Sequence, residues 1–282
     1  MTKSRNSKTA ARRAKKRRGS SRRTKTNALV RLFARLPRWV LWLSGIGIAL
    51  AYVFLILPIV LHYTPSWKAH YGEVPEPEGY PVRGIDISHY QNRIDWDQLR
   101  KARLGDFPIS FVIAKSTEGA TIADQTFSRN FLRARQKAFV RGAYHFFIPG
   151  TDAAKQARFF ISKTKLAPGD LPPILDIEKT GNLSKKELQE SVLAWLNIVE
   201  KAYGTPPIIY TYYSFKKSFL NTPAFDRYPF WIAHYYKDKL SYDGPWVMWQ
   251  YTDCGHVDGI KENVDCNVFN GSLKDLLNMT LK

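Results

Sequence analysis

An uninterrupted run of 22 uncharged residues, Val40 to Leu61, is the strongest constraint on how this 282-residue chain can fold. As a helix that rises 1.5 Å per residue, the run spans about 33 Å, enough to cross the hydrocarbon core of a bilayer. A helix of this length in a soluble core would alternate with polar positions, and this run does not. Aromatic residues flank both ends, as they do at membrane interfaces: Trp39, Trp42, Tyr63 and Trp67. The pattern predicts one transmembrane helix, with residues 39–63 as its full extent.

The segment before this run, residues 1–38, is strongly basic. It holds 15 of the 43 Lys and Arg, and the first acidic residue of the chain is Glu73. A block of like charge cannot bury enough apolar surface to fold, so we expect a disordered tail. The basic excess before the helix places this tail in the cytoplasm and the C-terminal part of the chain on the periplasmic or extracellular side.

Other interpretations of this N-terminal region are less favoured. A cleaved signal peptide would have a shorter basic segment, an apolar stretch of about 7–15 residues and a small-residue cleavage site. An uncleaved signal-anchor, which makes a single-pass membrane protein, fits better. The basic clusters of the tail could contact nucleic acid or anionic lipid headgroups. We expect the lipid headgroups as partner and do not expect nucleic acid.

The rest of the chain divides into a spacer and one domain. Residues 64–81 contain four prolines and three glutamates, which predict an extended linker. Residues 82–282 are enough for one domain with a sizeable core. Both cysteines of the chain, Cys254 and Cys266, lie in this domain. The exported compartment permits a disulfide between them, and free thiols are equally compatible with the sequence.

Alternating strand and helix patterns predict the architecture of the domain. Helical patterns cover Asp124–Ala138 and Thr151–Lys165, and a third helix begins at a capping box of Ser184 with Glu187 and ends at Gly204. The later strands follow one another closely. This order indicates an α/β fold, an irregular parallel TIM-like barrel with fewer helices than strands. Eight strands are predicted, at Val82–Ser88, Ile109–Lys115, Gly142–Phe147, Pro173–Ile177, Pro207–Tyr212, Phe230–His234, Trp246–Tyr251 and Val264–Val268.

Two carboxylic acids lie two residues apart at the end of one predicted strand. Asp176 and Glu178 follow the apolar run Leu171-Pro-Pro-Ile-Leu. In a strand, residues i and i+2 point to the same face, so the two acids would stand side by side. A close pair of carboxyl groups, one protonated and one ionised, is what glycoside hydrolysis requires. In barrels of this kind the active site lies at the C-terminal ends of the strands, where this pair is predicted.

Five further motifs accompany the pair, and together with it they resemble glycoside hydrolase family 25 over residues 82–271. This family comprises the muramidases, lysozymes of the Chalaropsis type that cut bacterial peptidoglycan, and its fold is an irregular (β/α) barrel. The resemblance implies the same fold, with peptidoglycan as the substrate. The motifs are Gly84-Ile-Asp-Ile-Ser-His-Tyr-Gln91, Phe111-Val-Ile-Ala-Lys-Ser-Thr-Glu-Gly119, Gly142-Ala-Tyr-His-Phe146, Trp249-Gln-Tyr251 and Val264-Asp-Cys-Asn-Val-Phe269.

The resemblance implies a role for each candidate residue. Glu178 is expected to be the general acid that protonates the leaving oxygen, with retention at the sugar. Asp176 is either the nucleophile or the group that orients the 2-acetamido oxygen of the substrate, the second being slightly favoured. Asp86 belongs to the same carboxylate cluster. The predicted substrate-binding residues are Asp265, Tyr144, Tyr210, Trp249, Lys115 and Glu118.

Two alternatives remain open. A chitinase-like N-acetylglucosaminidase also carries Asp-x-Glu on a barrel strand, although such enzymes usually show the longer Asp-Gly-x-x-x-Asp-x-Glu. A non-catalytic wall-binding module could tether a membrane to peptidoglycan, but no expected acid is missing from the motifs. The six histidines show no metal-ligand spacing, so we expect neither a metal nor a cofactor.

Overall fold

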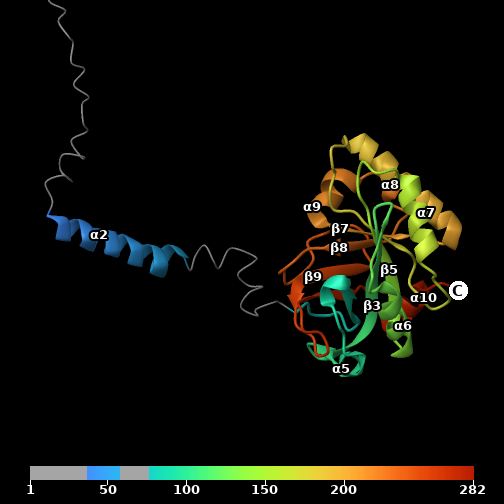
Figure 1. The fold of residues 1–282 in the computed structure, drawn as a ribbon, viewed down its shortest axis with the longest axis horizontal. Helices are drawn as coiled ribbons and strands as arrows, with labels where there is room; N and C mark the ends of the chain where they lie inside the picture. The colour runs from blue at the N-terminus through green and yellow to red at the C-terminus, as the bar shows by residue number, and fades with distance from the viewer. Residues whose placement is uncertain (1–36, 58–75) are drawn as a thin grey trace, which may run out of the picture. The chain divides into compact units, whose positions relative to one another are not determined.

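The computed structural model describes residues 37–57 and 76–282, which belong to two separate compact units. In the first unit, α2 (Arg38–Ala51) continues into the π-helical turn η1 (Tyr52–Ile56) (Figure 1). This helix is long and apolar enough to cross a membrane by length and composition. Its large apolar side chains are exposed, Trp42 for example to 74%. The predicted basic tail, apart from its last two residues, and the end of the predicted span lie outside the described residues.

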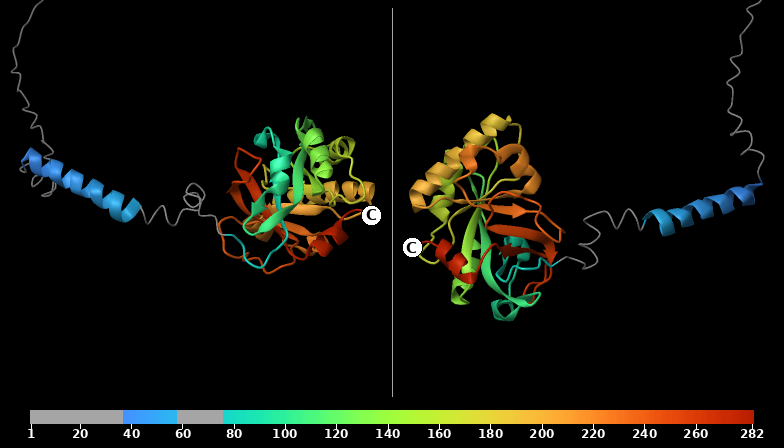
Figure 2. Two further views of the ribbon diagram at one scale, coloured as in Figure 1. Left: turned by 90° about the horizontal axis from the view of Figure 1, so that it is seen from below. Right: turned by 180° about the vertical axis from the view of Figure 1, so that it is seen from behind.

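The second unit is built on a closed barrel of eight strands. The strands follow one another around the barrel, and β1 closes it by pairing with both β3 and β10. Figure 2 shows the strands at the centre of this unit with the helices outside them. All eight predicted strands are confirmed. They are β1 (Arg83–Ile87), β3 (Phe107–Glu118), β5 (Val140–Phe146), β6 (Ile174–Asp176), β7 (Ile208–Tyr212), β8 (Phe230–Ala233), β9 (Met248–Gly255) and β10 (Val264–Phe269).

One strand departs from the predicted parallel barrel. β10 runs antiparallel to both of its neighbours, whereas the other barrel pairs are parallel. β9 ends at Gly255 and β10 begins at Val264. A parallel crossover needs about a dozen residues or more, so this short connection can only return the chain in the opposite direction. As a result, the start of β10 lies at the same barrel end as the C-terminal ends of the other strands.

The three predicted helices are confirmed, as α6 (Phe127–Gln136), α7 (Ala153–Lys163) and α8 (Lys185–Tyr203). The Ser184 hydroxyl accepts from the backbone of Glu187, and Gly204 ends α8 in the left-handed region at φ 73°. Shorter elements were not predicted: α5 (Trp96–Lys101), α9 (Tyr213–Phe215), α10 (Leu273–Met279), the 3₁₀ turns η2 (His89–Gln91) and η4 (Pro223–Phe225), the π-helical turn η3 (Lys216–Leu220), β2 (Arg103–Leu104) and β4 (Ile122–Ala123).

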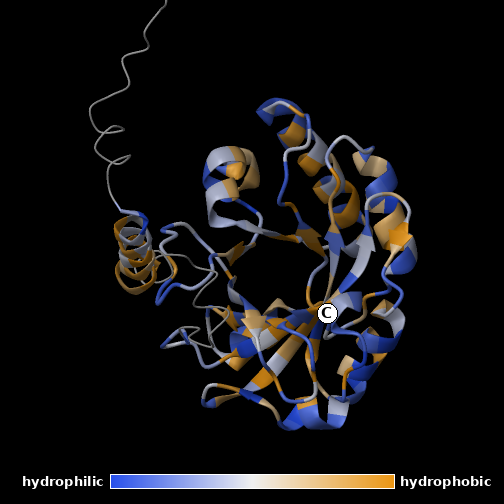
Figure 3. Ribbon diagram, turned by 60° about the vertical axis from the view of Figure 1, so that its left-hand side comes forward, coloured by the Kyte–Doolittle hydropathy of each residue, from blue (hydrophilic) through white to orange (hydrophobic). Residues whose placement is uncertain are grey.

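Alternation along the strands divides the core into an inner and an outer layer. Ile113, Ile174 and Met248 belong to the cluster inside the barrel. Leu175 and Ile209 belong to the layer between the strands and α7 and α8. Figure 3 shows apolar residues along the strands, and apolar alternating with polar residues around the helices. Neighbouring strand residues therefore face opposite sides, which decides which side chains can reach the barrel mouth.

The chain just before β1 packs onto the domain. Arg83 donates from Nη2 to the carbonyl oxygen of Pro77 at 2.6 Å. The ring of Tyr80 lies 5.6 Å from that of Trp246, centroid to centroid. The last part of the predicted linker is thus fixed to the barrel, while residues 64–75 lie outside the described part of the chain.

Candidate active site

Four carboxyl groups gather at one end of the barrel. Asp86 is the next-to-last residue of β1, Asp176 ends β6, and Glu178 follows two residues later. Because β10 is antiparallel, Asp265 near its start lies directly opposite Asp86 in the ladder. Asp86 and Asp176 are buried, with exposures of 5% and 6%, and Glu178 is half-buried.

Glu178 lies beyond the end of its strand, and the backbone of Ile177 holds it near the cluster. Ile177 donates to the carbonyl oxygen of Tyr210 at 3.0 Å. The hydroxyl of Thr211 donates to the carbonyl oxygen of Ile177 at 2.6 Å. The chain thus stays fixed to β7 for one residue past β6, and Glu178 emerges at the barrel mouth.

Burial and mutual repulsion favour the protonated forms of these acids. Burial raises the pKa of Asp86 to about 6, against the lowering effect of its hydrogen bonds. Burial, followed by the charges of Glu178 and Asp86, raises the pKa of Asp176 well above its usual value. Burial and Asp86 do the same to the pKa of Asp265. Burial also raises the pKa of Glu178, although Lys179, Tyr210 and Lys115 oppose the shift. The cluster can therefore hold protons near neutral pH, as an acid catalyst must.

A network of neutral groups holds Asp86 in place. Its Oδ2 accepts from Nδ2 of Asn267 at 2.7 Å and from Nε2 of Gln250 at 2.8 Å. Oε1 of Gln250 accepts in turn from the hydroxyls of Tyr210 at 2.6 Å and Tyr235 at 2.7 Å. Each donor thus has an acceptor, and the position of the Asp86 carboxylate is fixed by groups on four other strands or their ends, β7, β8, β9 and β10.

Gln250, Asn267 and Tyr235 belong to the site but were not predicted from the sequence, and Trp231, which could also stack on a sugar by residue type, was not among the predicted residues. Trp231 lines a small cavity with Asp86, Tyr144, Asp176 and Tyr210, and its indole N–H donates to Oδ1 of Asn267 at 2.8 Å. Gln250 and Asn267 lie within two of the motifs, but the predicted site residues were chosen for charged or aromatic side chains, which these two residues lack. Alternation along the strand was the available signal, because it places Gln250 on the face opposite its two aromatic neighbours.

Trp249 does not take the predicted position. Its side chain is 0% exposed and belongs to the outer core layer, where its ring lies 6.3 Å from that of Tyr80. Its indole N–H donates to the carbonyl oxygen of His234 at 2.8 Å. A ring buried on both faces offers no surface for a sugar, so stacking by Trp249 is a wrong prediction.

Tyr144 and Tyr210 do line the cavity beside Asp86 and Asp176. Lys115, on β3, donates to Oε2 of Glu118 at 2.6 Å and lies 4.9 Å from the centre of the Phe146 ring. The charge of Lys115 opposes, without reversing, the raising effect of burial on the pKa of Asp176. Oδ1 of Asp176 is buried and has no hydrogen-bond partner among the residues that the structure describes. That oxygen is free to accept a hydrogen bond from an N–H group of a bound molecule.

Other reactive groups lie apart from this chemistry. Cys254 and Cys266 are both free thiols. Within residues 37–57 and 76–282 no group of three or more His, Cys, Asp or Glu could hold a metal ion. The raised pKa values of its acids suit the carboxylate cluster to proton transfer, and its ionised members can stabilise positive charge.

Comparison with known proteins agrees with this geometry. Residues 85–260 match the model of glycosyl hydrolases family 25. Lysozyme M1 of Streptomyces globisporus is 33% identical over 215 residues, 70% of this chain and 70% of that protein. The uncharacterized protein YegX of Escherichia coli K12 is 44% identical over 201 residues, 71% and 74% of the two chains. The crystal structure of a lysozyme from Streptomyces coelicolor superposes with a TM-score of 0.66 at 30% identity, covering 72% of this chain and 98% of that one.

Proposed function

Because this chain belongs to glycosyl hydrolase family 25 and is a glycoside hydrolase of the muramidase type, we propose that it cleaves a specific bond of peptidoglycan. The bond is the β-1,4 linkage from N-acetylmuramic acid to N-acetylglucosamine, and cleavage proceeds with retention. The observation that carries the proposal is the half-buried Glu178 beside the buried carboxyls of Asp176 and Asp86 at the barrel mouth.

Glu178 acts as the general acid. The reaction needs a carboxylic acid that is protonated near neutral pH, and burial raises the pKa of Glu178. Its partial exposure leaves it accessible to a glycosidic oxygen. The proton passes from Glu178 to the leaving oxygen as the bond to the anomeric carbon breaks, and the ionised Glu178 then accepts a proton from the incoming water.

Asp176 supports the first displacement from the opposite side of the sugar. Its unpartnered Oδ1 suits the N–H of a 2-acetamido group, because that donor would satisfy a buried acceptor. The acetamido oxygen would then be turned toward the anomeric carbon as the attacking atom. Direct attack by Asp176 is the other route, and both routes lead to retention.

Asp86 and Asp265 complete the cluster. A hydrogen bond joins their carboxyl groups, lowers the pKa of Asp86 and raises that of Asp265. We infer that Asp265 donates in this bond, since the bond favours the ionised form of Asp86, which can stabilise positive charge on the sugar. Tyr144, Tyr210, Lys115 and Glu118 are proposed to contact the substrate around them, from the positions described above.

The N-terminal part anchors the enzyme. The apolar helix Arg38–Ile56 is proposed to span the membrane as an uncleaved signal-anchor. The basic tail then lies in the cytoplasm against anionic lipid headgroups, and the catalytic domain lies on the periplasmic or extracellular side, joined through residues 64–81.

The test is digestion of purified peptidoglycan by the full chain in detergent micelles. Products are reduced with borohydride and identified by mass spectrometry. Reduced muramic acid at the new ends is the expected result. Reduced glucosamine ends would instead indicate a chitinase-like N-acetylglucosaminidase, and binding without any new ends would indicate a non-catalytic tether.

A further inference from the structure

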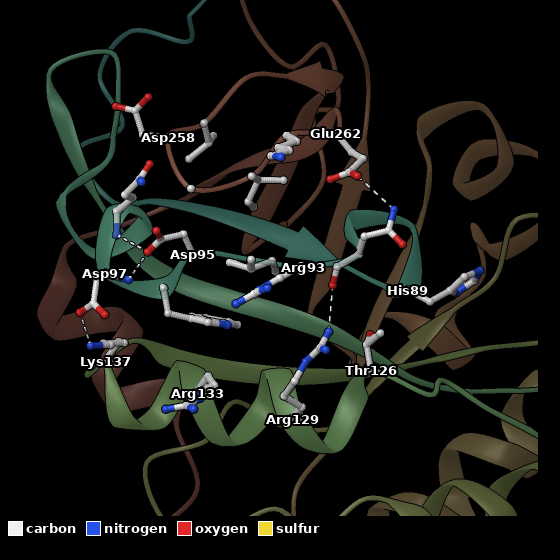
Figure 4. A pocket seen from close by; sticks show the side chains of 18 of the residues that line it. His89, Arg93, Asp95, Asp97, Thr126, Arg129, Arg133, Lys137, Asp258 and Glu262 are labelled. Atoms are coloured by element: carbon white, nitrogen blue, oxygen red, sulfur yellow. Dashed lines mark hydrogen bonds and ion pairs between the residues drawn. The ribbon is translucent and has the colours of Figure 1, made fainter.

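A large groove on the outside of the barrel does not include any residue of the carboxylate cluster. It has a volume of about 1750 Å³ and lies between the segment after β1, helix α6 and the connection from β9 to β10. In Figure 4, His89 and Thr126 lie at one end of the groove and Asp97 and Lys137 at the other. His89 follows Asp86 by three residues, so one end of the groove adjoins the barrel mouth.

Three arginines line the middle of the groove: Arg93, Arg129 and Arg133. Arg129 donates to the carbonyl oxygen of Asn92 at 2.8 Å, and Arg133 donates to Oε1 of Gln136 at 3.1 Å. Within the described part of the chain, none of the three has a carboxylate partner. Arg129 and Arg133 are four residues apart on α6, a spacing at which like charges repel. A fold that keeps three unneutralised guanidinium groups together is suited to bind an anion.

Three of the four acidic residues that line the groove already have a partner. Asp97 pairs with Lys137. Asp95 caps α5 by accepting from the backbone N–H of Asp97 at 3.0 Å and of Gln98 at 3.1 Å. Oε1 of Glu262 accepts from Nδ2 of Asn92 at 3.0 Å. The lining therefore offers free cationic donors in the middle, with amides and acids around them.

We propose that this groove binds the carboxylate-bearing peptide that substitutes the lactyl group of muramic acid. The inference rests on the proposed function, since it assigns the groove to a second part of the same substrate. Arginine forks match carboxylates in two-point contacts, and the peptide carries several free carboxylates along its length. The volume exceeds that of an ordinary small-molecule pocket and fits an extended chain.

Two observations favour the peptide over a phosphate-rich wall polymer. The groove adjoins the mouth at His89, so a peptide attached to a sugar bound there is already at high local concentration. The lining is also mixed in charge, because Asp258 and Glu262 line the groove across from Arg129 and Arg133. A uniformly anionic polymer would meet repulsion from these acids, whereas peptide amides and ammonium groups would find acceptors.

The test compares two substrates with the full chain in detergent micelles: peptidoglycan strands with their peptides, and the same strands after an amidase has removed them. The test variant is Arg93→Gln/Arg129→Gln/Arg133→Gln. A second variant changes the same three residues to Lys. The matched control, Lys185→Gln/Lys186→Gln/Lys201→Gln, removes the same charge from exposed positions on α8, outside the groove.

The measured quantity is the ratio of kcat/KM on peptide-bearing strands to that on stripped strands. We expect the Gln variant to lower this ratio about tenfold, the Lys variant to restore part of it, and the control to leave it unchanged. An unchanged ratio in the Gln variant, or an equal loss on both substrates, overturns the proposal.

A binding measurement separates this proposal from the proposed function. A soluble stem tripeptide is titrated into the full chain carrying Glu178→Gln, with and without the three arginine changes. Loss of tripeptide binding in the arginine variant supports the groove assignment, whether or not the wild type cleaves strands. If binding is lost in this way and the wild type cleaves no strand, the groove assignment stands and only the proposed cleavage fails. Absence of tripeptide binding together with binding of polyglycerol phosphate overturns the peptide assignment.

Discussion

Gln250 donates its side-chain N–H to Oδ2 of Asp86 at 2.8 Å. The orientation of the Gln250 amide is fixed, because its oxygen accepts from both Tyr210 and Tyr235. The N–H therefore always faces the carboxylate and stabilises its ionised form. This bond is one of those that lower the pKa of Asp86 against the effect of burial, which leaves the value at about 6.

Replacing Gln250 with Met should move the acid limb of the pH–activity profile to higher pH. Met has a similar volume but no N–H, so the ionised form of Asp86 loses a donor and its pKa rises above about 6. The measurement is kcat/KM from pH 4 to 9. Gln136→Met, at an exposed position of α6, is the control and should leave the limb in place. An unmoved limb in Gln250→Met would show that Asp86 does not set it.

Asp86→Asn should gain stability relative to the wild type as the pH rises. The pKa of Asp86 is raised in the fold from 3.8 to about 6. Below about pH 4, the neutral form of Asp86 thus stabilises the folded wild type by up to about 3 kcal/mol. This stabilisation is lost as the pH rises through 6. Urea unfolding of both proteins at pH 4 and pH 8 measures the difference. If the free energies of unfolding of the two proteins differ by the same amount at pH 4 and at pH 8, the pKa of Asp86 is not raised in the fold.

Glu178→Gln should remove nearly all hydrolysis and leave the fold intact. The amide has the shape of the acid but cannot give a proton to the leaving oxygen, so we expect a loss of about 10²–10⁴-fold. Release of reducing ends is measured, with circular dichroism as the check on folding. Glu190→Gln on α8 is the matched control and should be fully active. A fully active Glu178→Gln enzyme would remove the proposed mechanism.

Asp176→Asn should be severely impaired, because both proposed routes use its carboxylate. The stereochemistry of the wild-type product is the sharper test of the roles. NMR during early hydrolysis should show retention at the new anomeric centre. Inversion would require a water molecule between acid and base, with carboxyl groups about 6.5–9.5 Å apart, and would overturn the assignment of Glu178 and Asp176.

The full chain should fractionate with membranes through the helix Arg38–Ile56. Protease added outside the cell, or to the periplasm, should degrade the catalytic domain and spare the basic tail. A variant with Asp at both Ile46 and Ile48 places two charges within the helix and should weaken insertion. A soluble full chain, or a tail cut from outside, would contradict the anchor and its orientation.

The strands of this barrel were predictable because their apolar runs are bounded by turn residues. The direction of β10 was not, since apolar periodicity carries no information on strand direction. Only the shortness of the connection from Gly255 to Val264 contained that information. Its antiparallel course brings Asp265 to the same end as Asp86, so the missed feature is also one that assembles the site.

The site was predicted unevenly for a similar reason. The acids could be found from their spacing and motifs, because carboxyl groups are rare in apolar runs. Trp249 was chosen for its chemistry as an aromatic residue, but the strand alternates and places Gln250 on the side of the mouth instead. Residue type alone favoured the wrong neighbour. Deciding between them requires knowing which face of β9 is inside the barrel.

The attachment of the chain to β1 has a mechanical consequence. β1 begins at Arg83, which holds the preceding segment through Pro77, and it carries Asp86 near its other end. Tension on the N-terminal side reaches β1 only after the contacts of this segment, and hydrogen bonds to both β3 and β10 then oppose any displacement of the strand. A slip of one residue would turn Asp86 to the opposite face of the barrel wall. The bonds that would resist tension are therefore also the bonds that keep this carboxyl group in register with the site.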